Sequence, residues 1–484
     1  MSGALLGADG RREEDDMGWV ARTGITAGIV VVLAGGYLTA DAYDVVPGVL
    51  TTAPAVAPAA PFPTPPGAVD SASPAQTLPV LDESAPLPDA TAIAASLDAL
   101  VQDARLGGRV GGVVMDRMTG EVLAQSGAQT PMVPASTQKV LTAAAALASP
   151  GPEVTLTTKV VEVDAGTIAL VGGGDMMLAA EEGDPLAVNG RAGMADLATQ
   201  VAGELKLTGR TTVRLVVDDR YFSGPTVSPA VFAGNVTAGF IAPVTSVAVD
   251  IARLSDAEYA KRSADPSLAA AEILATRLTE LGITVEGPPA RGESASTAKV
   301  LGSVESAPLS EVVAYFLQHS DNTITEVVGR LVAIDAGLPA TFDGARQAVT
   351  ASVSRLGVDL TGAVLADCSG LGDGSALSAA QLAAVVDLLA DPAQPGLRAG
   401  AVGLPVAGLS GTLDDRFLAS PGRGVVRAKT GSLPNVTSLA GTVVTAQDRQ
   451  LVFVLLADAL PDGGAYGARL LMDGFVGGLV GSAD

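Results

Sequence analysis

Apolar residues recur with helical spacing at both ends of the main body of the chain. Leu97, Leu100 and Val101 lie on one side of a predicted helix over 92–106, and an alanine-rich helix is predicted over 140–147. The same spacing predicts further helices over residues 267–281, 311–317, 323–336 and 467–479.

Shorter apolar runs predict strands. The runs 109–116 and 121–125 flank Met118-Thr119-Gly120 and predict a hairpin, and strong strands are predicted over 438–445 and 451–457. Strand-like runs also dominate the middle of the chain, at 154–163, 167–171 and 212–217. The order of the elements predicts an α/β body interrupted by a long β-rich insertion.

One uncharged stretch, Thr23 to Ala40, precedes the body and is long enough for a membrane-spanning helix. Arg22 and two earlier arginines precede it, and no Lys or Arg follows before Arg105. This asymmetry predicts a cytoplasmic tail over 1–22, a single transmembrane anchor over 23–40 and an extracytoplasmic body. A signal peptide cleaved at Ala42, which would leave a secreted protein, is the main alternative, and a buried core helix is a further one.

The segment 41–91 is predicted to be a linker. Many of the prolines of the chain lie between Pro47 and Pro88, with Ala, Thr and Ser between them. Such a composition favours extended polyproline II structure and cannot bury a core. We interpret the linker as a stalk that holds the body away from the membrane.

Composition excludes several kinds of chemistry. The formal net charge is −23, which argues against a nucleic-acid partner because phosphates are neutralised by clustered basic side chains. Cys368 is the only cysteine and His319 the only histidine, so an intramolecular disulfide and a multi-histidine metal site are excluded. We therefore expect no metal and no cofactor.

A candidate nucleophile stands at the start of the alanine-rich helix. In Pro134-Ala135-Ser136-Thr137-Gln138-Lys139, Ser136 and Lys139 are three positions apart and share one face of a helix. A hydroxyl needs a nearby base, and Lys serves only if burial or positive charge lowers its pKa. The pattern alone is weak: Ser296-Thr297-Ala298-Lys299 repeats it in a polar stretch, and an ordinary capping serine is the competing interpretation.

Two further motifs strengthen the hypothesis. Ser320-Asp321-Asn322 lies between two predicted helices, and Lys429-Thr430-Gly431-Ser432 lies just before the C-terminal strands. S-x-x-K, S-D-N and K-T-G, in this order, form the catalytic set of penicillin-binding proteins and class A β-lactamases. On these motifs the chain resembles the class C low-molecular-mass penicillin-binding proteins, the D-alanyl-D-alanine carboxypeptidase/endopeptidase family.

Other segments carry the same resemblance over about residues 92–482. A long insertion between Lys139 and Ser320 is typical of this family, as are Leu170-Val171-Gly172-Gly173-Gly174-Asp175 and the Gly411-Thr412-Leu413 run before the third motif. One departure is Cys368, which stands where the family usually has Gly. If that glycine has a positive φ, Cys368 would strain the loop.

The resemblance implies a fold and a domain organisation. The fold is that of the serine β-lactamases and penicillin-binding transpeptidases, an antiparallel sheet with flanking helices and a helical subdomain. It places the catalytic domain at 92–150 and 307–484, and one or more inserted domains at 151–306.

The resemblance also implies an acyl-transfer mechanism on peptidoglycan stem peptides, with β-lactam antibiotics as covalent inhibitors. Ser136 attacks the carbonyl, Lys139 accepts its proton, Ser320 relays a proton to the leaving amine, and Asn322 positions Lys139 and the substrate amide. The remaining residues hold the terminal carboxylate or let the strand approach it: Lys429, Thr430, Gly431 and Ser432. The backbone N–H groups of Ser136 and Ser432 form the oxyanion hole.

Three functions remain open from the sequence. The leading one is a serine-type D-Ala-D-Ala carboxypeptidase, with or without endopeptidase activity. The alternatives are a β-lactamase and a non-catalytic wall-binding or scaffold protein on the same fold. A Ser-His-Asp triad at His319-Ser320-Asp321 is not expected, because triads are assembled from separate segments.

Overall fold

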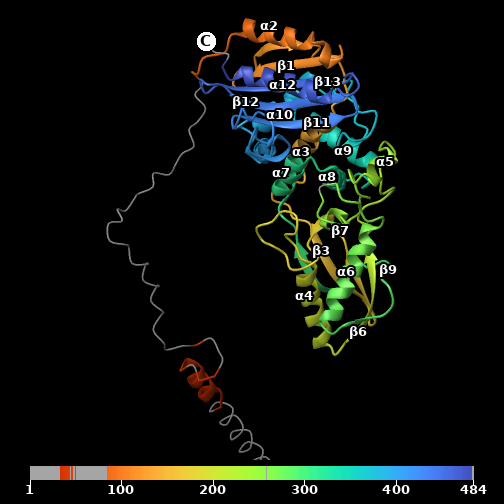
Figure 1. Ribbon diagram of the computed structural model, residues 1–484. Coiled ribbons are helices and arrows are strands. Elements are labelled where there is room, and N and C mark those ends of the chain that lie inside the picture. Colours follow the sequence, from red (N-terminus) through yellow and green to blue (C-terminus); the bar gives the residue numbers. More distant parts are fainter. Residues whose placement is uncertain (1–32, 44, 47–49, 51–83, 258, 482–484) are drawn as a thin grey trace, which may run out of the picture. The chain divides into compact units, whose positions relative to one another are not determined.

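The structure is a computed structural model that describes residues 33–43, 45–46, 50, 84–257 and 259–481 (Figure 1). Contacts divide the chain into two units, 1–78 and 79–484. In the first unit residues 33–42 are helical. The predicted tail over 1–22 and the first part of the predicted anchor lie outside the described residues, as does most of the linker. No described helix has the length and apolar character needed to cross a membrane.

A five-stranded antiparallel sheet forms the centre of the second unit, in the order β11-β12-β13-β1-β2. The last strand in the sequence, β13, pairs with β1, so segments from before and after the insertion share one sheet. The strands are β1 (Val110–Asp116), β2 (Val122–Ser126), β11 (Val426–Leu433), β12 (Val436–Val444) and β13 (Gln450–Ala457).

Helices cover both faces of this sheet, which explains why β12 and β13 are buried along nearly their whole length. On one face α2 (Ala90–Val101) and α12 (Ala465–Leu479) pack against side chains such as Val114 and Phe453. On the other face α10 (Ala379–Ala390) packs against Val113 and Val454. Figure 1 shows these layers.

A helical subdomain lies beside the sheet, and its central helix is α3 (Lys139–Ala148). All its residues from Lys139 to Leu147 are buried, and the small alanine side chains let neighbouring helices approach closely. The helices around it are α7 (Leu309–His319), α8 (Asn322–Asp335), α9 (Phe342–Arg355) and α11 (Arg398–Val402).

The residues between α3 and α7 form a second sheet, in the order β10-β3-β4-β6-β8, with β9 also paired to β6. Its strands are β3 (Thr157–Asp164), β4 (Thr167–Val171), β6 (Thr212–Asp218), β8 (Thr284–Val285), β9 (Ala290–Arg291) and β10 (Val300–Glu305). This region also contains a two-stranded sheet, β5 (Asp175–Leu178) with β7 (Val247–Val249), and the short helix α5 (Ala233–Thr237).

The region is richer in helix than its sequence predicted. Helix α6 (Pro266–Glu280) was expected, but α4 (Met194–Leu207), which connects the parallel strands β4 and β6, was not. Leu197, Val201 and Leu205 are buried along one side of α4 and carry the helical spacing that would have indicated it.

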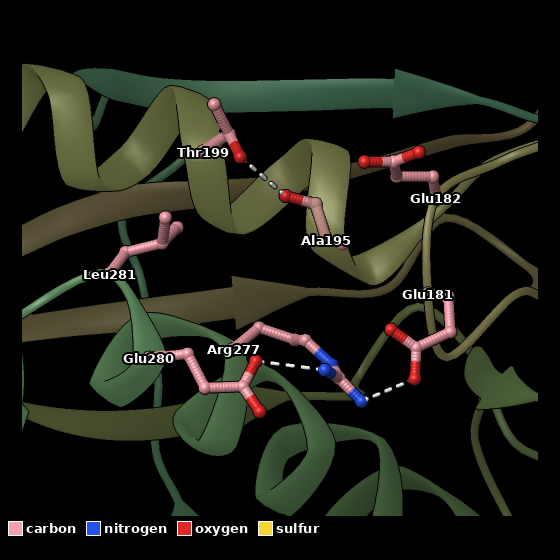
Figure 2. A pocket seen from close by; sticks show the side chains of 7 residues that line it. All are labelled: Glu181, Glu182, Ala195, Thr199, Arg277, Glu280 and Leu281. Carbon is pink, nitrogen blue, oxygen red and sulfur yellow. Dashed lines mark hydrogen bonds and ion pairs between the residues drawn. The ribbon is translucent and has the colours of Figure 1, made fainter.

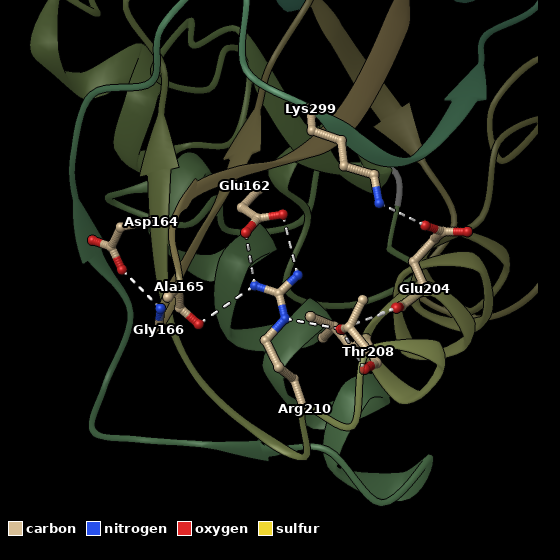
Figure 3. A network of polar contacts seen from close by, with 9 residues as sticks. Glu162, Asp164, Ala165, Gly166, Glu204, Thr208, Arg210 and Lys299 are labelled. Atoms are coloured by element: carbon tan, nitrogen blue, oxygen red, sulfur yellow. Dashed lines mark hydrogen bonds and ion pairs between the residues drawn. The ribbon is translucent and has the colours of Figure 1, made fainter. Parts of the chain in front are cut away.

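A polar network ties the strands of this region to α4 (Figure 3). Arg210 donates to both carboxylate oxygens of Glu162 on β3 and to the Thr208 hydroxyl that caps α4. The bidentate pairing of a guanidinium with a carboxylate fixes the relative orientation of the two elements.

Loops of the same region pack directly against the helical subdomain. Phe222, Val244 and Ile251 belong to the same apolar cluster as Val312 of α7 and Leu331 of α8. These two helices flank Ser320-Asp321-Asn322. The inserted region between α3 and α7 therefore supports one of the three candidate motifs.

Candidate active site

Ser136 lies in a single 3₁₀ turn, η2 (Ala135–Gln138), that leads directly into α3. Residues three apart are eclipsed in a 3₁₀ turn, which brings Ser136 Oγ to 3.0 Å from Lys139 Nζ. Ala135 has a φ of 48°, a strained value that this turn requires. The turn therefore presents a partly exposed hydroxyl to a lysine amine beneath it.

Lys139 is fully buried, and three oxygens surround its amine. Nζ donates to Ser136 Oγ, to Asn322 Oδ1 at 2.6 Å and to the Ser369 carbonyl at 2.8 Å. Burial lowers the pKa of Lys139 to about 8, although the negative charges of Asp367, Glu326 and Asp321 act in the opposite direction. A lysine with this pKa is partly neutral near physiological pH and can accept a proton.

Ser320 and Asn322 stand at the corner between α7 and α8. Ser320 caps α7 with a left-handed φ of 53°, and Asp321 caps α8 by accepting from the Ile324 N–H. Asn322 donates through Nδ2 to the Phe240 carbonyl at 2.9 Å, so its Oδ1 faces Lys139. The Asp321 cap follows from local sequence, since Asp is a preferred N-cap residue.

The sequence analysis placed the third motif just before the C-terminal strands. In the structure the motif lies within a strand, β11. Lys429 is fully buried and donates to Ser320 Oγ at 2.9 Å and to the Thr430 carbonyl at 2.8 Å. Burial, together with the nearby charges of Lys139 and Arg416, lowers the pKa of Lys429 well below its ordinary value.

Gly431 is required for close packing between β11 and η2. A Cβ atom at this position would lie 2.1 Å from Ser438 Oγ and 2.8 Å from the Pro134 carbonyl. The missing side chain thus lets the strand approach the turn that carries Ser136. Ser432 is exposed near the end of β11. Together these contacts bring all eight predicted site residues to one place.

Several residues that contact this site were missed from the sequence. Glu326 is fully buried in α8 and accepts from the N–H groups of Cys368 and Ser369, and it thereby fixes the loop whose carbonyl binds Lys139. Burial, and then the charge of Asp367, raises the pKa of Glu326. The only sequence signal was its place on the apolar helix after Asn322.

The loop is not strained at Cys368, contrary to the expectation from the family pattern, because Cys368 is absent from the described residues with positive φ. Its side chain fills the space next to Gly329, where a Cβ atom would lie 2.5 Å from Sγ. Gly370, two residues later, has the left-handed conformation, with φ of 75°. Cys368 acts here as a small buried apolar group.

Two further residues contact the hydroxyls of the third motif. Thr430 donates to Thr412 Oγ1 at 2.8 Å, and Arg469 of α12 donates through Nη2 to Ser432 Oγ at 3.1 Å. Thr412 belongs to a run that the sequence comparison had singled out without a role. Arg469 carried no sequence signal, because it comes from a helix that reaches the site only in the folded chain.

His319 does not form a triad with its neighbours. Its ring lies 4.4 Å from that of Tyr315, one turn earlier on α7, and burial lowers its pKa. Among the described residues it makes no hydrogen bond to Ser136 or to a carboxylate.

A separate hollow of about 500 Å³ opens between α4 and α6 in the inserted region (Figure 2). Arg277 crosses it and pairs with Glu181 and Glu280. None of the eight site residues lines it, so the hollow is distinct from the candidate site.

Comparison with known proteins gives consistent matches over most of the chain. The model of the D-Ala-D-Ala carboxypeptidase 3 (S13) family matches residues 93–257 and 252–475. A carboxypeptidase of Mycobacterium tuberculosis is 36% identical over 401 residues, which is 80% of this chain and 84% of that protein. Carboxypeptidase DacB of Mycolicibacterium smegmatis is 38% identical, over 78% of this chain and 82% of its own.

Among solved structures, penicillin-binding protein 4 of Haemophilus influenzae has the same fold. It superposes with a TM-score of 0.66 over 78% of this chain and 97% of its own, at 22% identity. This likeness confirms the predicted fold of sheet and helices. Of the transmembrane helix that was predicted over 23–40, only residues 33–40 lie among the described residues.

Proposed function

The chain belongs to the D-Ala-D-Ala carboxypeptidase 3 (S13) family, and on that premise we propose that Ser136 cleaves the terminal D-Ala from D-Ala-D-Ala peptides of the cell wall. The observation that carries the proposal is the 3.0 Å contact between Ser136 Oγ and the amine of a fully buried lysine. A hydroxyl becomes an effective nucleophile when a base within hydrogen-bond distance takes its proton.

Acylation begins with proton transfer from Ser136 Oγ to the neutral amine of Lys139. The oxygen attacks the carbonyl carbon of the penultimate D-Ala, and the charge that develops on the carbonyl oxygen is stabilised by the N–H groups of Ser136 and Ser432. The C–N bond then breaks and leaves an ester on Ser136.

Ser320 carries the proton to the leaving amine. Its hydroxyl accepts from Lys429, which leaves its own hydrogen free to be donated toward the substrate. Asn322 holds Lys139 through Oδ1. The departing D-Ala takes up one proton, and water then cleaves the ester and restores Ser136.

The third motif binds the carboxylate of the terminal D-Ala. Ser432 is exposed and Thr430 is partly exposed, and the buried amine of Lys429 donates to the Thr430 carbonyl beside them. Hydrogen bonds from charged and hydroxyl donors suit a carboxylate.

The test is the loss of one D-Ala from a pentapeptide, followed by mass spectrometry. We expect release by the wild-type chain and none by Ser136→Ala. A cross-linked peptide dimer in the same assay measures endopeptidase activity. Absence of D-Ala release by a chain that binds penicillin normally would contradict the proposal and favour a scaffold role.

A β-lactamase on the same fold is distinguished by the fate of the acyl-enzyme. Penicillin-binding protein 4 of Haemophilus influenzae, a similar solved structure, is also known as a complex with a β-lactam. We expect this chain to form a long-lived penicillin adduct at Ser136. Rapid turnover of penicillin would instead favour the lactamase.

We also propose that the catalytic body works outside the cytoplasmic membrane, anchored by residues 23–40. Support comes from the uncharged stretch and the arginine asymmetry of the sequence. Fractionation tests this: the full chain should sediment with membranes, while a chain with a cleaved signal would appear in the medium and start near Ala42.

A further inference from the structure

An arginine that has no acidic partner among the described residues lies at the end of the site that we assign to the substrate carboxylate. Arg469 projects from α12 and donates one N–H to Ser432 Oγ at 3.1 Å. Within the described part of the chain, no carboxylate lies within ion-pair distance of its guanidinium. Helix α12 is anchored in the core by Ala468 and Met472, both fully buried, so Arg469 comes from a rigid element.

The other cations near this end of the site are already engaged. Lys429 is fully buried, donates to Ser320 and to the Thr430 carbonyl, and has a lowered pKa because of burial and nearby charge. Arg416 forms a bidentate ion pair with Asp473. Neither of them presents an unpaired positive charge to the exposed hydroxyl of Ser432.

Arg469 has the donors that a carboxylate needs. A guanidinium carries five N–H groups, and the contact with Ser432 uses one of them. Its planar fork matches the two oxygens of a carboxylate, and it keeps its charge at every physiological pH. By donating to Ser432 Oγ it also leaves the Ser432 hydrogen free to point toward the ligand.

We propose that Arg469, together with Ser432, binds the C-terminal carboxylate of the peptide substrate and makes the enzyme select peptides with a free carboxylate. This inference rests on the proposed function. It adds to the third motif a charged contact with the carboxylate from a residue outside the three motifs, while Lys429 also holds Ser320.

The experiment compares two substrates that differ only in the carboxylate. One is an acyl-D-alanyl thioglycolate thioester with a free carboxylate, and the other is its methyl ester. A thioester is reactive enough for turnover to be followed without the carboxylate contact. The variants are Arg469→Gln and Arg469→Lys, with Arg398→Gln as a control, because Arg398 is an exposed arginine of α11 whose loss changes the charge equally.

We expect Arg469→Gln to lower kcat/KM about tenfold or more for the free acid, the scale of a lost charged hydrogen bond, and to leave the methyl ester unchanged. Arg469→Lys should be intermediate, since Lys keeps the charge and loses the fork. Arg398→Gln should match the wild type on both substrates.

Equal effects of Arg469→Gln on the two substrates, or no effect on either, would overturn the inference while the proposed function stands. Failure of the wild-type chain to hydrolyse either substrate would count against the proposed function itself. Thermal unfolding of each variant identifies any loss of activity that comes from instability.

Discussion

Lys139 is the residue on which the chemistry depends. Its spacing from Ser136 was visible in the sequence, but its burial and its contacts with Asn322 and the Ser369 carbonyl required the folded chain. The negative charges of Asp367, Glu326 and Asp321 favour the ammonium form, and burial outweighs them and lowers the pKa. The result is a base whose pKa lies close to physiological pH.

The rate of acylation by penicillin should therefore depend on pH through Lys139. Below its pKa of about 8 the amine is protonated and cannot accept the Ser136 proton, so the second-order rate should rise with pH through about 8. Stopped-flow measurement of adduct formation tests this.

Lys139→Arg provides the control, since a guanidinium stays protonated, and we expect a loss of about 10²–10⁴-fold at every pH. A wild-type rate that is flat between about pH 6 and pH 10 would exclude Lys139 as the base.

At the scale of single residues, the sequence indicated the three motifs because each is a short contiguous pattern with its own local chemistry. Glu326 and Arg469 act only after α8 and α12 have packed, and neither belongs to a recognisable pattern. Gly431 was predicted to allow close approach to a ligand. In the structure the atoms that leave no room for a Cβ atom at Gly431 belong to Ser438 and Pro134.

Among the elements, the junction of β1 and β13 joins the two separated parts of the central sheet. Asp116 ends β1 and accepts from two nitrogens of Arg449, just before β13. Both side chains are nearly inaccessible, and Arg449 also donates to the Ala85 carbonyl. This buried pair fixes the register of strands that are far apart in sequence.

Removal of one partner should be costly. We expect Arg449→Leu to lower the free energy of unfolding by about 3–5 kcal/mol, because it leaves the Asp116 carboxylate buried without its cation. Urea unfolding measures the change. The double variant Asp116→Leu/Arg449→Leu should recover most of the loss, and equal destabilisation by the single and double variants would contradict this explanation.

For some helices the periodicity of apolar residues was sufficient to predict the bounds. Long helices with a clear apolar side, such as α6 and α8, were predicted close to their observed bounds. Helix α4 was not predicted although its buried positions are regularly spaced, because strand-forming runs precede and follow it in the sequence.

Across the whole molecule, the inserted region contributes directly to the site. The Phe240 carbonyl fixes the Asn322 amide, and Arg262 donates to the neighbouring Gly239 carbonyl. Asn322 and Phe240 come from segments that sequence analysis assigned to different domains. Only the folded chain shows that the inserted region helps to orient a residue of the catalytic set.

A change in the inserted region should therefore reduce activity. Gly239 has a φ of +80°, and a Cβ atom there would lie 2.4 Å from the Ala260 carbonyl oxygen. We expect Gly239→Ala to displace Phe240 and lower kcat/KM for a D-Ala-D-Ala peptide about tenfold or more, as small misplacements of catalytic groups do.

Gly120→Ala is the matched control, because Gly120 also has a left-handed φ but has open space around it. It should reproduce the conformational cost and leave kcat/KM unchanged. Equal kcat/KM for the two variants would show that the inserted region does not support the site.

The central claim is that Ser136, activated by Lys139, forms the acyl-enzyme. Mass spectrometry of peptides from penicillin-treated protein tests it most directly, with Ser136→Ala and Ser296→Ala as a matched pair, since both serines begin an S-x-x-K pattern. We predict an adduct on the Ser136 peptide in the wild type and in Ser296→Ala, and none in Ser136→Ala. An adduct that survives in Ser136→Ala, or that maps to another peptide, would contradict the account.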